Sequence, residues 1–321
     1  MLTVPNENYK WHIAGIGAMG SLLAGRFCSA KFAVNLVLKN TQQLAIYQQS
    51  PLTLIDDQSI STYHPDAIDI EHLNNEPIHY LLCCVKAYDV TTLLLRLKHR
   101  LNENSIIILM HNGLGVLDEI KQQRPELRII SGVNTLGAYL EKPFTVRSFL
   151  NGKLYLGSAA GQFTPAEINT VCNAFKEAQL PYQWEENIHA FIWEKFAQNC
   201  CINLFTALYT CKNGDLLLQI KLLKKMAGEV SQVLNAHGIA MSETELFQKV
   251  IQLIQITANN YSSMYKDVQN NKPTELAYLN QQLIALAQQK AVDIPFNVEL
   301  LKQFSTKFPH QRMHTRLSPI D

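Results

Sequence analysis

The segment KWHIAGIGAMGSLLAGRFCSAK, residues 10–31, decides the architecture of the first half of the chain. Its first five residues are typical of a short strand, the glycines at 15, 17 and 20 mark a tight turn, and helical spacing follows. A strand, a glycine turn and a helix N-terminus in that order direct backbone N–H groups and a positive helix end toward a pyrophosphate. The GxGxxG spacing alone is a weak signal, but this context favours a dinucleotide site.

A second strand is predicted at Val34–Leu38, which begins a βαβ unit. Lys39 follows it, at the place where a chain that binds NAD(H) usually carries Asp or Glu for the ribose 2′-hydroxyl. A cation there attracts a 2′-phosphate, so NADP(H) is favoured over NAD(H). The alternative is a solvated loop lysine, and the residue by itself leaves the two interpretations about even.

Two further apolar runs, Ile78–Val85 and Ile106–Met110, are typical of strands covered on both faces in a parallel sheet. The first run leads into Lys86 and the second into Asn112, within the sequence HNGLG. Ligands in open α/β folds bind at the carboxyl ends of the strands, so both residues are candidate site residues by position. A surface lysine and a turn-forming asparagine are the ordinary alternatives.

The remaining sequence divides the chain into two predicted domains. Ile129–Tyr139 and residues 149–159 are predicted as strands that finish the sheet, and from Asn187 to about Phe308 only helical patterns occur. We therefore predict an α/β domain of doubly wound type at residues 1–186 and an all-helical domain at 187–321. Residues 243–268 and 274–292 each have the pattern of one helix.

The first predicted helix of the second domain, within Asn187–Gly214, carries three polar residues on one face. Lys195, Asn199 and Asn203 recur at i, i+4 and i+8 among apolar neighbours. A buried ammonium is costly without partners, and burial lowers the pKa of a lysine toward the range of proton transfer near neutral pH. The stripe either faces a polar ligand or belongs to a structural network that ties helices together.

A break at residues 270–274 separates the last two long helical patterns. Glu275 is expected in the first turn of the helix that follows, where the positive helix end favours a carboxylate, and Ser263 lies shortly before the break. An ordinary first-turn acid and an ordinary helix hydroxyl are the common interpretations of these two residues.

Composition limits the classes of function. The 321 residues are 47% hydrophobic and 17% charged with a net charge of +1, so we expect no nucleic-acid partner. The sequence has neither an apolar run of membrane length nor a signal peptide, so no membrane partner and a cytoplasmic location are expected. Seven cysteines without CxxC spacing suggest free thiols, and no metal site is predicted; His310 and His314, spaced i, i+4, lack the companion acid.

Over nearly its whole length the sequence resembles the 2-dehydropantoate 2-reductase (ketopantoate reductase) family, which uses NADPH. The resemblance lies in short motifs whose order and spacing together are specific. These motifs are Gly15–Gly20, Lys86–Ala87, HNGLG at 111–115, WEKFAQNCCIN at 193–203, Asn213–Gly214, NYSSM at 260–264 and KPTELAYLN at 272–280.

The resemblance implies a role for each matching residue. Lys195 is implied as the proton donor, and Glu275 as an acid where cofactor and substrate meet. Asn112 is implied to contact both ligands. The implied substrate contacts are Asn199, Asn203, Asn213, Asn260 and Ser263. The implied cofactor contacts are Gly15, Ile16, Gly17, Ala18, Met19, Gly20, Lys39, Lys86 and Ala138. The family often has Arg where this chain has Lys39, which keeps the charge but loses the bidentate geometry.

The implied fold is a Rossmann-like N-terminal domain followed by a helical domain similar to the C-terminal domain of 6-phosphogluconate dehydrogenase. The implied function is NADPH-dependent reduction of ketopantoate to (R)-pantoate in pantothenate and coenzyme A biosynthesis. A 2-keto acid is then the small-molecule partner, and a homodimer is compatible with the resemblance. Two alternatives stay open: a related NADP(H)-dependent dehydrogenase for another 2-keto or 3-hydroxy acid, and a non-catalytic redox sensor that binds NADP(H).

Overall fold

The computed structural model describes residues 10–56, 59–71 and 76–311. The chain divides into two compact units: Met1–His111 with Leu117–His189, here the sheet unit, and Asn112–Val116 with Ala190–Asp321, here the helical unit. The loop at 112–116 is therefore grouped with the helices, although the chain enters it from a strand of the sheet unit and leaves it into that unit again.

The main sheet of the sheet unit has eight strands in the order β12-β11-β8-β7-β6-β1-β2-β5. Six neighbouring pairs are parallel, and β11 runs antiparallel to β8. The strands are β1 (Trp11–Ala14), β2 (Val34–Leu38), β5 (Asp66–Asp69), β6 (Tyr80–Cys83), β7 (Ile106–Leu109), β8 (Arg128–Asn134), β11 (Leu154–Ala160) and β12 (Tyr182–Trp184). The central strands are buried throughout, as their continuous apolar runs predict.

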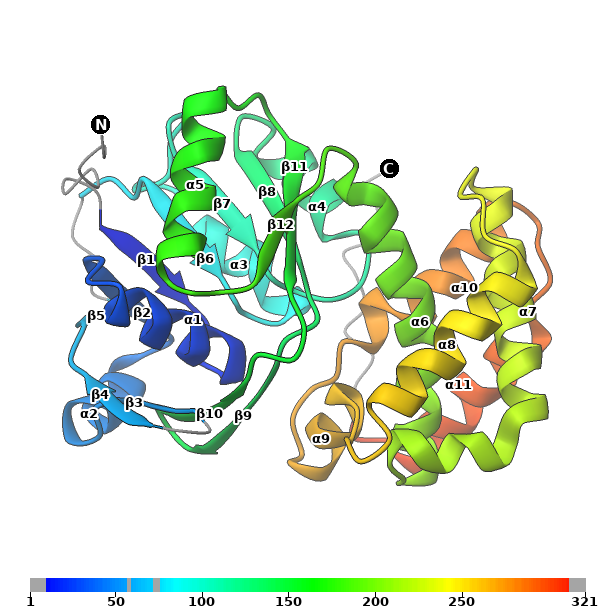
Figure 1. Cartoon of the computed structure of the whole chain (residues 1–321). Coiled ribbons are helices and arrows are strands. Elements are labelled where there is room, and N and C mark those ends of the chain that lie inside the picture. The colour runs from blue at the N-terminus through cyan, green and yellow to red at the C-terminus, as the bar shows by residue number, and fades with distance from the viewer. Residues whose placement is uncertain (1–9, 57–58, 72–75, 312–321) are drawn as a thin grey trace. The chain divides into compact units, whose positions relative to one another are not determined.

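Helices cover both faces of the main sheet. Because side chains alternate along a strand, successive residues pack against the helices of opposite faces. Leu82, Ile108 and Ile130 join the core formed with α1 and α5, whereas the residues that precede them, such as Leu81, are buried outside that core. Figure 1 shows α1 and α5 in front of the sheet and α3 behind it. The helices of this unit are α1 (Ala18–Ser29), α2 (Thr41–Gln49), α3 (Ala87–Arg96), α4 (Val116–Gln123) and α5 (Pro165–Glu177).

A second, four-stranded sheet was not predicted. Its order is β4-β3-β10-β9, with β3 (Leu52–Ile55), β4 (Ile60–Tyr63), β9 (Gly137–Lys142) and β10 (Thr145–Phe149). The expectation that residues up to Tyr139 and from Phe149 onward finish the main sheet is therefore wrong at these ends. Asn134 turns the chain out of the main sheet, because its Oδ1 accepts a hydrogen bond from Leu136 N at 2.8 Å, and β9 then pairs with β10.

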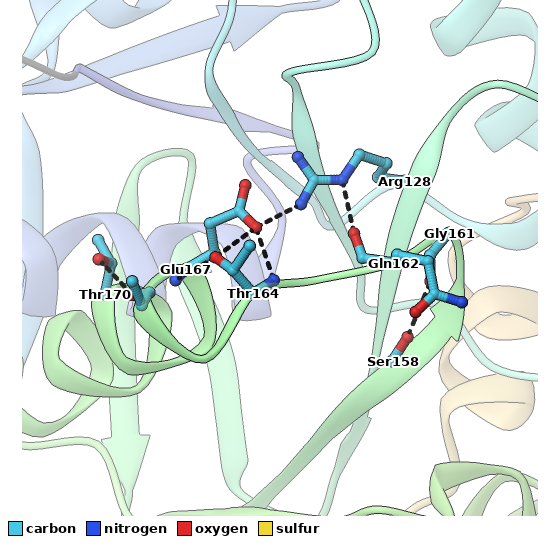
Figure 2. Close-up of polar contacts among 8 residues, drawn as sticks. Arg128, Ser158, Gly161, Gln162, Thr164, Glu167 and Thr170 are labelled. Atoms are coloured by element: carbon cyan, nitrogen blue, oxygen red, sulfur yellow. Dashed lines mark hydrogen bonds and ion pairs between the residues drawn. The ribbon is translucent and has the colours of Figure 1, made fainter.

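The connection from β11 to α5 is held by a side-chain cluster (Figure 2). Thr164 and Glu167 form a capping box at the start of α5, in which Thr164 N donates to Glu167 Oε2 at 2.8 Å and Glu167 N donates to Thr164 Oγ1 at 3.3 Å. Arg128 of β8 pairs with the same carboxylate at 2.7 Å and donates through Nε to Gln162 O at 3.0 Å. These bonds fix the entry of α5 against the sheet.

We expect Thr164→Ala to lower the free energy of unfolding by about 1 kcal/mol, because it removes the side-chain cap. The matched control is Thr170→Ala in the same helix. The Thr170 hydroxyl is exposed and only donates back to Ala166 O at 2.9 Å, so its loss should change stability by less than about 0.5 kcal/mol. Urea unfolding followed by circular dichroism measures both variants. Equal effects would show that the cap does not hold the turn.

The helical unit contains α6 (Ile188–Tyr209), α7 (Ile220–Ala236), α8 (Glu243–Ile256), α9 (Ser263–Gln269), α10 (Asn280–Gln289) and α11 (Pro295–Lys307), with 3-10 turns η1 (Asn213–Gln219) and η2 (Leu276–Tyr278). Their apolar faces form one core. Between 190 and 311 the described residues contain no strand, as predicted. Within the described ranges, no helix combines the length and apolar character needed to cross a membrane. All seven cysteines are free thiols.

Two helix predictions were wrong in this unit. The pattern at 243–268 is divided into α8 and α9. The backbone of the turn between them accepts hydrogen bonds from the start of η1, because Asn213 N donates to Asn260 O at 2.9 Å and Gly214 N to Ala258 O at 3.0 Å. The pattern that starts at Thr274 begins as the 3-10 turn η2, and α10 starts only at Asn280.

Candidate active site

The glycine turn after β1 is packed so closely that side chains are excluded at two positions. Gly15 has φ +83°, and a Cβ there would lie 2.5 Å from Val85 N. A Cβ at Gly20 would lie 2.2 Å from Gly15 O. The first and third glycines thus allow the strand, the turn and the helix to approach one another closely, which is the structural role of these two positions in the GxGxxG pattern.

Gly17 has a different environment. A Cβ at this position would meet no atom of the described chain within 4 Å, so the turn is open on this side. Gly17 is the N-cap residue of α1, whose N-terminus has no side-chain cap and no acidic residue in its first turn. Backbone N–H groups at an uncapped helix N-terminus beside open space suit a pyrophosphate, so these residues fit a dinucleotide.

Lys39 and Lys86 follow strands that flank β1 on either side. Lys39 comes directly after β2, is exposed, and donates its backbone N–H to Gln43 Oε1 at 2.8 Å. Lys86 is the N-cap residue of α3, which follows β6. Both β2 and β6 pair in parallel with β1, so both lysines lie at the carboxyl edge of the sheet where the glycine turn begins. Ala138 lies instead in β9 of the second sheet, which contacts α1.

In the helical unit, α6 carries the predicted polar stripe. Lys195 and Asn199 are partly buried, and Asn203 is 6% exposed. The adjoining residues Phe196 and Cys200 are fully enclosed in the core. Burial lowers the pKa of Lys195 to about 8, while the Glu275 carboxylate acts in the opposite direction and raises it.

Glu275 is 3% exposed and lies at the N-cap position of η2, not in the first turn of an α-helix as predicted. The turn cannot continue as an α-helix because Leu279 takes φ −116° and ψ −104°. Asn112 donates from Nδ2 to Glu275 Oε2 at 3.3 Å. The structure therefore brings together Lys195, Glu275 and Asn112, which come from three separate parts of the sequence.

The other predicted substrate residues occupy two adjoining turns. Asn213 is 7% exposed and donates from Nδ2 to Thr257 Oγ1 at 2.9 Å, while its Oδ1 has no hydrogen-bond partner. Its backbone N–H bonds to Asn260 O. Ser263 is the first residue of α9. A buried amide oxygen without a partner is rare in a folded protein and marks a place where a ligand or water would donate.

Comparison with known proteins identifies the family. A model described as ketopantoate reductase PanE/ApbA matches residues 11–161, and its C-terminal counterpart matches residues 187–307. The chain belongs to the ketopantoate reductase family. As a member it is an enzyme, an oxidoreductase, and its two parts have the Rossmann-like α/β and all-helical folds that the sequence predicted.

Relatives and solved structures agree with the assignment to the ketopantoate reductase family. The 2-dehydropantoate 2-reductase of Vibrio cholerae is 29% identical over 304 residues, which are 92% of this chain and 96% of the relative. A family member from Ralstonia eutropha JMP134 has a similar fold, with a TM-score of 0.83 and 20% identity over 94% of this chain and 100% of that one. A ternary structure of D-mandelate dehydrogenase with NADH and anilino(oxo)acetate has a TM-score of 0.86 and 20% identity, covering 94% and 99% of the two chains.

The sequence did not predict two residues whose hydrogen bonds connect the helices that carry the family motifs. Thr206 Oγ1 and Ser262 Oγ share a hydrogen bond of 2.6 Å, and Ser262 in turn caps α9 by accepting from Tyr265 N. Because Thr206 also bonds to Asn203 O at 3.0 Å, this pair joins the Asn203 turn of α6 to the start of α9. The available signal was Thr206 itself, a polar residue three positions after Asn203 among apolar neighbours in α6.

Proposed function

We propose that this enzyme reduces 2-dehydropantoate (ketopantoate) to (R)-pantoate with NADPH, as a step of pantothenate and coenzyme A biosynthesis. The observation that carries the proposal is the group formed by Lys195, Glu275 and Asn112, which combines a lysine of lowered pKa, a buried acid and a carboxamide. The sheet unit supplies the cofactor-binding turn, and the helical unit supplies the group that handles the proton.

Lys195 is proposed as the proton donor. The glycine turn of the sheet unit would hold a reduced nicotinamide cofactor, which would supply the hydride for the ketone carbon of the substrate. The Lys195 ammonium stabilises the negative charge that develops on the substrate oxygen and donates a proton to it from Nζ. Burial keeps water away from Lys195. It therefore strengthens this electrostatic stabilisation, and it lowers the pKa of the ammonium so that the proton is given up more readily.

Glu275 and Asn112 are proposed to tune and orient this group. The Glu275 carboxylate opposes the effect of burial on the pKa of Lys195, and so keeps the amine protonated near neutral pH. It also accepts a hydrogen bond from Asn112 Nδ2 at 3.3 Å, which orients the carboxamide beside the carboxylate. The polar side chains of Asn199, Asn203, Asn213, Asn260 and Ser263 are proposed to bind the carboxylate and hydroxyl of the keto acid.

The direct test is an assay with purified enzyme, NADPH and ketopantoate, followed by nicotinamide absorbance. A panel of 2-keto acids that includes ketopantoate, 2-ketoisovalerate and phenylglyoxylate tests the substrate. Ketopantoate should have the highest kcat/KM. A clear preference for another acid would assign the chain to a different substrate within the same chemistry, and NADPH binding without turnover of any acid would favour a sensor.

The rate of reduction should depend on pH through Lys195. The pKa of about 8 means that the amine is protonated below pH 8 and loses its proton above it. We expect kcat to be nearly constant below about pH 7, to reach half of that value near pH 8, and to fall about tenfold per pH unit well above pH 8. A pH–rate profile at saturating substrates measures this. A profile that stays flat to pH 10 would remove Lys195 as the acid.

Lys39 is proposed to select NADPH by its charge. Lys39→Asp should lower kcat/KM for NADPH at least about tenfold relative to NADH, because a carboxylate repels the 2′-phosphate and accepts from the 2′-hydroxyl. The control is Lys98→Asp, which makes the same charge change at an exposed residue after the far end of α3. The ratio of the two kcat/KM values should stay unchanged there. An unchanged ratio in Lys39→Asp would place phosphate recognition on other residues.

A further inference from the structure

The HNGLG loop contacts the turn η2 through the backbone of both segments. Gly113 has φ +90°, and a Cβ there would lie 2.3 Å from Tyr278 O and 2.7 Å from Tyr278 Cβ. Leu114 N donates to the same carbonyl oxygen at 2.9 Å. Only glycine combines this backbone conformation with this closeness. We call the contact of Gly113 and Leu114 with Tyr278 the backbone latch.

The latch lies directly beside two residues of the proposed active site. Asn112 immediately precedes Gly113, and Glu275 is bonded to Tyr278 across η2 because Tyr278 N donates to Glu275 O at 3.0 Å. The side chains of Asn112 and Glu275 then meet at 3.3 Å. A shift at the latch therefore moves the carboxamide, the carboxylate or both.

The far end of the same segment is tied to the helix that carries Lys195. Asn280 is wholly buried and donates from Nδ2 to Cys200 O of α6 at 3.1 Å. Leu114, on the loop side, packs against the core of the helical unit. Within residues 275–280, Asn280 is thus bonded to α6, while Glu275 and Tyr278 are bonded to the HNGLG loop.

We infer that Gly113 is a positioning residue, which acts through the backbone latch to hold Asn112 and Glu275 in place around Lys195. The inference rests on the proposed function, because turnover of a keto acid is its functional readout. Close placement of this kind matters to the rate, since a misplacement of about 1 Å can cost about 100-fold.

The test is Gly113→Ala, in which either the loop or η2 has to give way. We expect kcat/KM for ketopantoate, normalised to folded protein, to fall at least about tenfold. The dissociation constant for NADPH should stay within about threefold, because the glycine turn of the sheet unit is untouched. The matched control is Gly238→Ala, another glycine of the helical unit with positive φ (+79°), whose Cβ would meet nothing within 4 Å. Its kcat/KM should stay within about twofold of the unsubstituted enzyme.

Equal kcat/KM in the two variants would overturn the role of the latch while leaving the proposed function standing. If the unsubstituted enzyme reduces no 2-keto acid, the proposed function fails instead. In that case, or if Gly113→Ala does not fold, amide hydrogen exchange of the unsubstituted protein tests whether the backbone latch is formed. The Leu114 amide should exchange as slowly as the core amides of α6; exchange at the rate of an open loop amide would overturn the latch.

Discussion

Replacing Lys195 by alanine should lower kcat for ketopantoate reduction at least about 100-fold, the scale for loss of a general acid. The effect should fall on kcat and kcat/KM together, because the ammonium interacts most strongly with charge that exists only during the reaction. NADPH binding, measured by fluorescence or calorimetry, should be retained. The basic limb of the pH–rate profile should also disappear, since the titrating amine is gone.

The control for this substitution is Lys302→Ala in α11, which removes an exposed lysine from the same unit. It should leave kcat, KM and stability nearly unchanged. A kcat for Lys195→Ala within about threefold of the unsubstituted enzyme would remove Lys195 from the chemistry. In that case its lowered pKa would be a by-product of burial in α6, which is the structural-network alternative that the sequence left open.

Gly20→Ala should destabilise the sheet unit by about 3 kcal/mol or more, because its Cβ would lie 2.2 Å from a backbone oxygen that cannot move without opening the turn. Gly17→Ala should leave the stability unchanged but weaken the binding of NADPH. Its backbone, at φ −87°, accepts any residue and its Cβ meets open space, so the free energy of unfolding should stay within about 0.5 kcal/mol. The dissociation constant for NADPH should nevertheless rise at least about tenfold, because the methyl group occupies the approach of the pyrophosphate to the helix N-terminus.

Each of these two variants is the control for the other. Urea unfolding and a fluorescence titration with NADPH measure both quantities on both proteins. If Gly17→Ala binds NADPH normally, the pyrophosphate does not approach the turn at this point. If Gly20→Ala is as stable as the unsubstituted protein, the turn is not packed as the structure describes.

The predictable part of the fold follows from local patterns. The glycine turn, the apolar strands of the main sheet and the long helix α6 were predicted correctly, because each depends on a backbone conformation or a hydrophobic period within about 20 residues. The second sheet was missed because its strands come from distant segments: β3 pairs with β10, and the paired residues Thr53 and Thr145 are 92 positions apart. Nothing in either segment identifies a distant partner.

The candidate site divides in the same way. The stripe of Lys195, Asn199 and Asn203 follows from helical periodicity, and Lys39 and Lys86 follow from their places after strands. Their proposed roles came from the family resemblance. The contact between Asn112 and Glu275, the 3-10 turn that starts beside Glu275, and the bond of Thr206 to Ser262 depend on packing between segments. No periodicity encodes such contacts.

Residues 10–31 are sufficient to specify a strand, a glycine turn and a helix, since backbone sterics and the hydrophobic period act within the segment itself. The pKa of Lys195 is a property of another kind. It depends on how far α6 is removed from water and on the carboxylate of Glu275, which lies 80 positions along the chain. Desolvation and charge interactions act through space, so the acidity of this amine exists only once the helical unit has folded.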